Sequence, residues 1–177
     1  MLSNSPVVLV GLMGSGKTTV GQIVARRTGR TFIDTDDAIE ARTGRTVREL
    51  WEQGGEAAYR ELESRVVLEG LDGGDGPVLI AAPGGAVLDP AVRAALCRPD
   101  VVVVWLHADP SELATRVRPD DHRPLLGEHP GDVLETMERE RASLYAGVAD
   151  AVIETRGKAP DTVAAEVITA IAAPGSR

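Results

Sequence analysis

The residues from Gly11 to Thr18 have the types and spacing of a phosphate-binding loop. They read GLMGSGKT, follow the apolar run 7–10 directly and open a segment with helical periodicity at 20–25. The glycines of this loop tolerate positive φ and let backbone N–H groups approach a polyphosphate. Lys17 adds positive charge for the β- and γ-phosphates, Thr18 a hydroxyl for Mg²⁺, and the helix N-terminus a favourable dipole. The motif predicts a nucleotide site formed by Gly14, Ser15, Gly16, Lys17, Thr18 and Thr19.

A group of carboxylates follows the next apolar run. Residues 31–33 predict a strand, and Asp34, Asp36 and Asp37 come directly after it. Ligands of open α/β sheets bind at the carboxyl edge, so we expect these side chains beside the P-loop. If the chain stays extended, Asp34 and Asp36 lie on the same side, one near a metal and the other near an acceptor hydroxyl. The alternative is that Asp36 or Asp37 only caps a helix starting at Ala38.

Three arginines and one glycine turn are further candidates for ligand binding. In a chain of net charge −8, anionic ligands must be held by individual guanidinium groups, and Arg60, Arg123 and Arg141 stand out. Taken singly, each is more often a solvated surface charge. Gly84 and Gly85 follow the third apolar run and could bring backbone amides close to a ligand. The alternative for this pair is a tight turn after a strand.

The scaffold is predicted from short apolar runs separated by helical segments. The runs cover residues 7–10, 31–33, 78–80, 101–106 and 151–153. Such an alternation is typical of βαβ units and a parallel sheet, and the run 101–106 lacks polar alternation, as expected of a central strand covered on both faces. Between residues 46 and 71 the helical spacing is interrupted at Gly54 and Gly55. We therefore expect two inserted helices there, forming a substrate-binding region.

The amino-acid composition limits which binding partners and which cellular location are expected. The 177 residues predict one domain, and 19 basic against 27 acidic residues, with no basic tract, make nucleic acid an unfavourable partner. A single cysteine, Cys97, excludes an internal disulfide framework and fits a cytoplasmic setting. No apolar run approaches the length needed to span a bilayer. The spacing of His107, His122 and His129 makes no metal set, and we assign them no catalytic role.

The order of motifs along the chain resembles that of the shikimate kinase family. The segments that carry the resemblance are GLMGSGKT at 11–18, DTD at 34–36, GRTV at 44–47, GEAAYR at 55–60, PGGAV at 83–87, RPLL at 123–126 and RASLY at 141–145. The match covers the chain from Val7 to about Ile171, and its motifs are far more specific than a P-loop alone. The resemblance implies a P-loop NTPase domain of the nucleoside-monophosphate-kinase-like α/β class, with a five-stranded parallel sheet in order 2-3-1-4-5 flanked by helices. It implies one domain over 1–177, inserted substrate-binding helices at about 36–72 and a lid loop at about 117–130.

The reaction implied by this resemblance is transfer of the ATP γ-phosphoryl group to the 3-hydroxyl of shikimate, which gives 3-phosphoshikimate and ADP for aromatic amino acid synthesis. Lys17, Asp36 and Arg123 would be catalytic, and Thr18 and Asp34 would hold Mg²⁺. ATP would also contact Arg116, Arg123 and Pro160. Shikimate would be bound by Asp36, Arg60, Gly84, Gly85 and Arg141. We expect a cytoplasmic monomer whose partners are ATP and shikimate, with neither nucleic acid nor membrane.

One departure and two alternatives accompany this interpretation. Pro83 stands where the family usually has the first of three glycines, and proline removes an N–H and fixes φ near about −65°. The nearest alternative is another small-molecule kinase on the same scaffold, such as a gluconate kinase. Arg60 and Arg141 argue against an uncharged sugar or a nucleobase, although gluconate also has a carboxylate. The other alternative is a regulatory module that binds ATP without turnover.

Overall fold

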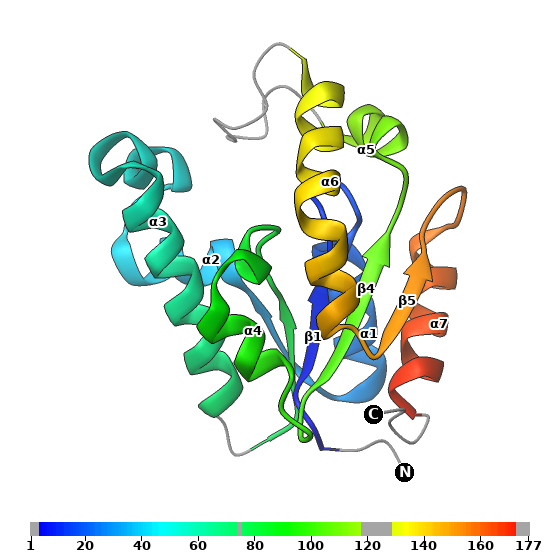
Figure 1. The fold of residues 1–177 in the computed structure, drawn as a ribbon. Helices are drawn as coiled ribbons and strands as arrows, with labels where there is room; N and C mark the ends of the chain where they lie inside the picture. Colours follow the sequence, from blue (N-terminus) through cyan, green and yellow to red (C-terminus); the bar gives the residue numbers. More distant parts are fainter. Residues whose placement is uncertain (1–3, 74–75, 118–128, 173–177) are drawn as a thin grey trace.

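A five-stranded parallel sheet forms the centre of the protein (Figure 1). The computed structural model describes residues 4–73, 76–117 and 129–172. The strands run in the order β2-β3-β1-β4-β5, and each neighbouring pair is parallel. Their bounds are β1 Val7–Val10, β2 Thr31–Asp34, β3 Val78–Ala81, β4 Val102–His107 and β5 Ala151–Glu154. The predicted fold class and strand order are confirmed.

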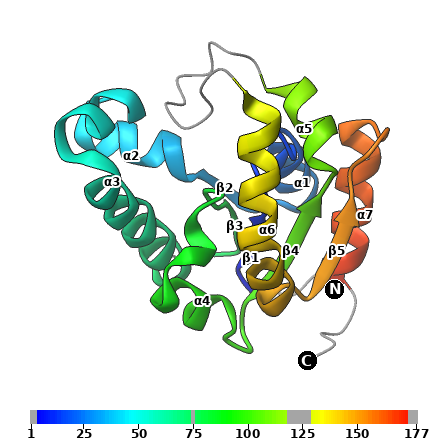
Figure 2. The ribbon, with the colours of Figure 1, turned by 45° about the horizontal axis from the view of Figure 1, so that its top comes forward.

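Helices cover both faces of this sheet and extend beyond one of its edges. Helices α3, α4 and α6 pack on one face and α1 and α7 on the other, and Figure 2 shows α2 and α3 reaching beyond the edge formed by β2. Four of the helices begin with proline, whose fixed φ suits the first helical position. The bounds are α1 Lys17–Thr28, α2 Thr35–Thr43, α3 Val47–Asp72, α4 Pro90–Leu96, α5 Pro110–Arg116, α6 Pro130–Val148 and α7 Pro160–Ala172, with a short 3₁₀ helix, η1, at Ala86–Leu88.

The core consists of two apolar layers that meet at β1. All four residues of this strand are 0% exposed, because successive side chains point to opposite faces and helices cover both. Val8 and Val10 pack with α3, α4 and α6, whereas Val7 and Leu9 pack with α1 and α7. The strand that feeds the P-loop is therefore fixed on both faces.

The parallel register brings the loops after β1, β2 and β3 to one edge of the sheet. Leu9 of β1 and Asp34 of β2 both pair with Ala81 of β3. The backbone N–H of Ala82 continues this alignment by donating to the Leu9 carbonyl at 3.0 Å. The P-loop, the aspartates and the turn at 83–85 consequently leave the sheet side by side.

The region inserted between β2 and β3 consists of α2 and α3. Helix α3 is broken at Gly55, whose φ of 72° and ψ of 178° are not helical. Its first segment begins with a capping box, in which Thr46 and Glu49 satisfy each other's backbone N–H groups. The interruption predicted at Gly54 and Gly55 occurs, and the non-helical residue is Gly55.

The extended conformation considered for Asp34 to Asp36 does not occur. Helix α2 already begins at Thr35, because the Asp34 carboxylate accepts the backbone N–H of Asp36 at 3.1 Å and caps the helix. The alternative, in which Asp36 or Asp37 caps a helix at Ala38, is wrong as well. The helix places Asp36 in its first turn, at the same edge of the sheet as the P-loop.

His107, at the end of β4, joins the edge strand β5 to helix α6. Its ring nitrogens lie 2.5 Å from Glu154 and 3.2 Å from Glu138. Partial burial opposes its protonated form, but the two carboxylates prevail and raise the pKa of His107 above its ordinary value. His107 is not among the residues lining the cavity described below.

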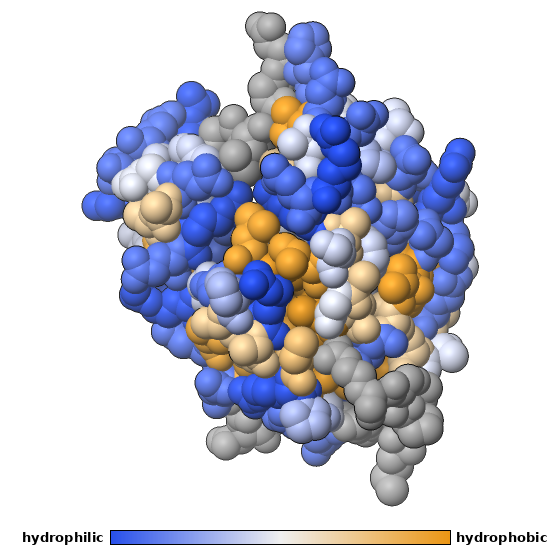
Figure 3. Space-filling model, viewed as in Figure 1, coloured by the Kyte–Doolittle hydropathy of each residue, from blue (hydrophilic) through white to orange (hydrophobic). Residues whose placement is uncertain are grey.

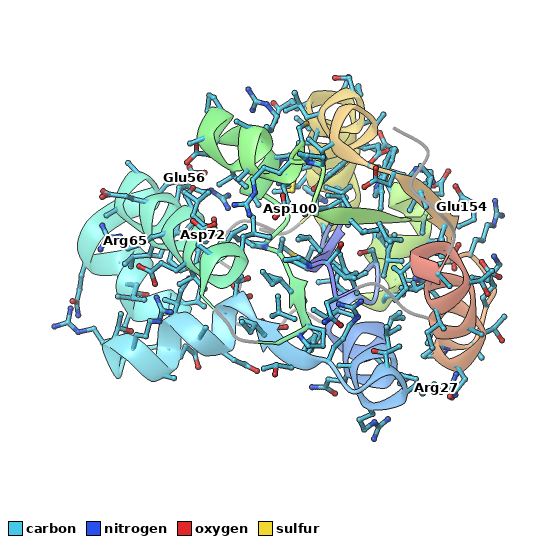
Figure 4. The ribbon with its side chains drawn as sticks, turned by 90° about the horizontal axis from the view of Figure 1, so that it is seen from below. Arg27, Glu56, Arg65, Asp72, Asp100 and Glu154 are labelled. Atoms are coloured by element: carbon cyan, nitrogen blue, oxygen red, sulfur yellow. The ribbon has the colours of Figure 1, made fainter. Side chains whose placement is uncertain are left out.

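Charged side chains are dispersed around the outside of the fold. Figure 4 views the molecule from below and labels several of them, including Asp72 and Asp100. Arg98 pairs with both carboxylates, at 2.6 and 2.8 Å, at the end of the molecule opposite the P-loop.

The face in Figure 3 is largely hydrophilic, with hydrophobic residues gathered between α3 and α6. Among the described residues, no helix combines the length and apolarity that a membrane span requires.

Candidate active site

A cavity of about 340 Å³ lies at the carboxyl edge of the sheet, between the P-loop, the inserted helices and α6. Its size is in the range of small-molecule sites. Two of the predicted site residues that the structure describes are absent from its lining: Ser15, which is 1% exposed, and Pro160, an exposed residue at the start of α7. Arg123 and most of the predicted lid fall outside the described residues. The predicted residues in the lining are Gly14, Gly16, Lys17, Thr18, Thr19, Asp34, Asp36, Arg60, Gly84, Gly85, Arg116 and Arg141.

The P-loop has the backbone geometry that phosphate binding requires. Gly14 and Gly16 adopt positive φ of 81° and 92°, and Gly11 has a φ of 141°. A Cβ on Gly11 would lie 2.4 Å from the Leu106 carbonyl oxygen, so only glycine fits there. Helix α1 starts without a side-chain cap, which leaves its first N–H groups directed at the cavity edge.

Lys17 is held inside this loop by backbone acceptors. Its ammonium donates to the carbonyls of Gly11 at 2.8 Å and Leu12 at 3.0 Å. These bonds keep a positive charge next to the N-terminus of α1, where the helix dipole also favours anions. The arrangement suits a polyphosphate.

Thr18 and Asp34 bring two oxygen donors together at the edge of the cavity. The Thr18 hydroxyl donates to Asp34 Oδ2 at 2.6 Å, and the other carboxylate oxygen caps α2. Hydroxyl and carboxylate oxygens are ligands that Mg²⁺ accepts, and this ion keeps several waters when it binds beside phosphates. The pair therefore fits a magnesium ion held by few protein ligands.

On the opposite wall, the second segment of α3 presents Arg60 to the cavity. Its guanidinium donates to Glu63 at 2.7 Å and lies 3.4 Å from Glu56. It also lies over the Trp51 ring, 5.8 Å from the centroid. At Gly85 a Cβ would stand 2.3 Å from the Arg60 guanidinium, so the glycine makes room for this side chain.

Glu63 is a buried carboxylate behind Arg60, and it is 4% exposed. Desolvation is the largest influence on it and raises its pKa to about 7, against the opposing effect of the Arg60 charge. The nearby Asp36 carboxylate also favours the protonated form, and Arg141 favours the ionised one. The buried pair thus contains a group that titrates near neutral pH.

Helix α6 supplies a second guanidinium group and a buried tyrosine. Arg141, 6% exposed, and Tyr145, fully buried, both donate to the Gly84 carbonyl, at 3.1 and 2.6 Å. The turn after β3 is thereby fixed to α6. Arg60 and Arg141 consequently flank the same glycine pair, which makes this end of the cavity suitable for a carboxylate.

Arg116 joins three segments at the other end of the cavity. It donates to Glu112 at 2.5 Å and to the Thr155 hydroxyl and carbonyl, both at 3.1 Å. A longer bond of 3.4 Å reaches the Gly14 carbonyl of the P-loop. Arg116 is thus ordered beside the P-loop, whereas Pro160 stands apart from the lining.

Several site residues were not identified from the sequence. Tyr59 lines the cavity and donates to Asp36 at 3.0 Å, and Glu63 lies behind Arg60. Trp51 also lines the cavity and packs against Tyr59, with the two rings tilted by 52°. The available signal was the spacing of Tyr59, Glu63, Val66 and Val67, which places all four on one buried stripe of a helix.

Solved structures share this fold at two levels of similarity. A gluconokinase from Sinorhizobium meliloti matches with a TM-score of 0.57 and 17% identity over 97% of this chain and 94% of that one, which supports the fold alone. Shikimate kinase from Acinetobacter baumannii, solved in complex with shikimate, matches with a TM-score of 0.90 and 34% identity, over 96% of this chain and 94% of that one. The gluconate kinase alternative is therefore not favoured.

Sequence comparison agrees with the second of these matches. Shikimate kinase from Burkholderia lata is 46% identical over 150 residues, which are 84% of this chain and 80% of the relative. The family model for shikimate kinase matches residues 13–172. The chain therefore belongs to the shikimate kinase family.

Proposed function

We propose that the cavity binds ATP and shikimate together and transfers the γ-phosphoryl group to the 3-hydroxyl of shikimate. The observation that carries this proposal is the pairing of two anion sites in one cavity. A P-loop lies at one end, and Arg60 and Arg141 flank the turn at 84–85 at the other. This arrangement suits one polyphosphate and one carboxylate, held with the acceptor hydroxyl between them.

The residues divide the work by charge and position. The P-loop amides and Lys17 bind the phosphates and stabilise negative charge on the phosphoryl group during transfer. Arg60 and Arg141 bind the shikimate carboxylate, with the amides of Gly84 and Gly85 nearby. Asp36 binds shikimate hydroxyls and takes the proton from the attacking oxygen. No covalent intermediate is required.

Thr18 and Asp34 would hold Mg²⁺ in this proposal, Thr18 directly and Asp34 through water. When bound, the ion neutralises charge on the β- and γ-phosphates. Arg116 and Pro160 would flank the adenine, and Arg123 would come from the lid to the phosphoryl group and help exclude water. A monomer acting in the cytoplasm also stays a prediction.

The deciding experiment measures ADP release by the purified protein with Mg²⁺ and ATP, with and without shikimate. Gluconate and a nucleoside monophosphate serve as alternative acceptors. Release that requires shikimate supports the proposal. Release with gluconate instead supports the related sugar-acid kinase, and ATP binding without any release supports a regulatory module.

The titration of Glu63 predicts how shikimate binding depends on pH. Below its pKa of about 7 the carboxyl is protonated, and Arg60 then lacks a buried negative charge that competes with the substrate carboxylate. We expect the KM for shikimate to fall about fivefold as the pH is lowered from 8 to 6. Steady-state kinetics across this range measures the effect.

The matched control for this pH dependence is Glu63→Gln, which keeps the shape and the acceptor oxygen but cannot ionise. Its KM for shikimate should stay nearly constant from pH 8 to 6, close to the wild-type value at pH 6. A slope that persists in the variant would assign the titration to another group, such as a histidine.

The proline at the first position of the glycine turn is expected to be tolerated. The Pro83 carbonyl accepts the Ala86 N–H at 3.0 Å, and neither Gly84 nor Gly85 needs positive φ. We expect Pro83→Gly to change the KM for shikimate less than threefold, because the turn forms without the additional freedom of glycine. A much lower KM in the variant would mean that the missing N–H of proline weakens substrate binding.

A further inference from the structure

The hydroxyl of Tyr59 donates to Oδ1 of Asp36 at 3.0 Å inside the cavity. Burial, and then the negative charges of Asp36 and Glu63, raise the pKa of Tyr59 above its ordinary value. The phenol therefore remains an O–H donor throughout the neutral range. This protonated donor faces Asp36, the carboxylate that takes the proton of the attacking shikimate hydroxyl in the proposed reaction.

The position of this hydroxyl is set by packing around its ring. Tyr59 is 4% exposed and packs against Ile39 and Val66 in a small apolar cluster, separate from the two main layers. Its ring lies 5.8 Å from that of Trp51, at an interplanar angle of 52°. Because these contacts fix the ring, the hydroxyl can orient the carboxylate instead of merely following it.

One turn of α3 carries both Arg60, which faces the cavity, and Tyr59, which contacts Asp36. Tyr59 and Arg60 are adjacent on α3, in the segment after the break at Gly55, and Glu63 lies one turn further on. Asp36 belongs to a different helix, α2. The hydrogen bond from Tyr59 therefore fixes Asp36 relative to the segment that positions Arg60.

We propose that Tyr59 is a positioning residue that orients the Asp36 carboxylate toward the acceptor hydroxyl of shikimate. The inference rests on the proposed function, since it assigns Asp36 to the acceptor. A rigid spacing between the proton acceptor and the carboxylate-binding guanidinium holds the substrate hydroxyl in line for attack. The hydroxyl contributes through Asp36 and does not itself touch the reacting atoms.

The direct test is Tyr59→Phe, which removes one oxygen and keeps the packed ring. We expect kcat/KM for shikimate to fall about tenfold, because hydrogen bonds to charged groups are among the stronger ones, while the KM for ATP changes less than twofold. The control is Thr43→Val, which removes a hydroxyl from α2 that donates to the Ile39 carbonyl at 2.8 Å, and it should match the wild type. Thermal unfolding of all variants is measured in parallel.

A double-mutant cycle with Asp36→Asn separates positioning from general support of the fold. If Tyr59 acts through Asp36, adding Tyr59→Phe to Asp36→Asn changes kcat/KM for shikimate less than twofold. A full additional tenfold loss, an equal rise in the KM for ATP, or loss of folding in Tyr59→Phe would each overturn the proposal. So would a folded Tyr59→Phe with wild-type kcat/KM.

The wild-type measurement distinguishes failure of this inference from failure of the proposed function. Shikimate-dependent ADP release by the wild type together with an unaffected Tyr59→Phe overturns the positioning role alone. A wild type that releases no ADP with shikimate overturns the proposed function and this inference with it.

Discussion

Lys17→Ala is expected to lower kcat by about a thousandfold while the protein stays folded. The Lys17 ammonium is held by the carbonyls of Gly11 and Leu12, beside the N-terminus of α1. Phosphoryl transfer requires mainly positioning and compensation of the charge on the group being transferred, and alanine provides neither at this position. Steady-state ADP release at saturating ATP and shikimate measures the loss.

Two further variants test whether the effect comes from charge. Lys17→Met keeps most of the side-chain volume and should be as inactive as Lys17→Ala. Arg27→Ala removes a cation from the far end of the same helix, where Arg27 pairs with Asp161 at 2.5 Å, and it should keep wild-type kcat. A Lys17→Ala enzyme within tenfold of the wild type would remove Lys17 from the catalytic assignment.

Arg60→Ala is expected to raise the KM for shikimate about a hundredfold, with little change in the KM for ATP. The guanidinium group faces the cavity at the end opposite the P-loop, and charge-assisted bonds to a carboxylate are about twice as strong as neutral ones. Loss of Arg60 leaves Arg141 to bind the carboxylate alone. Separate titrations of shikimate and ATP distinguish this result from a general loss of activity.

The stability of Arg60→Ala needs a separate control, because the substitution also removes the ion pair that Arg60 forms with the buried Glu63 at 2.7 Å. Breaking such a pair costs about 3 kcal/mol of unfolding free energy. Arg60→Ala/Glu63→Gln should recover much of that stability and still bind shikimate weakly. Arg65→Ala, which breaks an exposed pair with Glu61 on the same helix, should change neither quantity. Unchanged shikimate affinity in Arg60→Ala would contradict the carboxylate-binding assignment.

Much of the scaffold could be predicted because buried parallel strands have a simple pattern. The strands β1 and β4 appear in the sequence as unbroken apolar runs, and helices between them force a parallel sheet. The P-loop could also be predicted from its glycines, since few other residue types adopt the positive φ found at Gly14 and Gly16. The strand order came from the family resemblance, because hydrophobic periodicity does not specify which strands are neighbours.

The features of the site that could not be predicted are contacts between polar side chains that only the folded structure brings together. Asp34 was recognised as a site residue, but its capping of α2 depends on the turn that follows β2, so the sequence did not decide whether the chain stays extended as far as Asp36. Glu63 lies three residues after Arg60, a spacing that also occurs in exposed helical pairs, and only the packing of α3 shows it to be buried. The contact of Tyr59 with Asp36 joins residues far apart in sequence, and a hydroxyl on a buried ring gives no periodic signal.

Gly85 has a consequence for how sequences of this enzyme can vary. The Arg60 guanidinium occupies the space that a side chain at position 85 would need, so a methyl group there would displace the cation that faces the substrate. The structure therefore requires a small residue at position 85 because of the space that Arg60 occupies. A replacement at Gly85 should therefore weaken shikimate binding through a shift of Arg60, and a replacement of Arg60 should weaken it further.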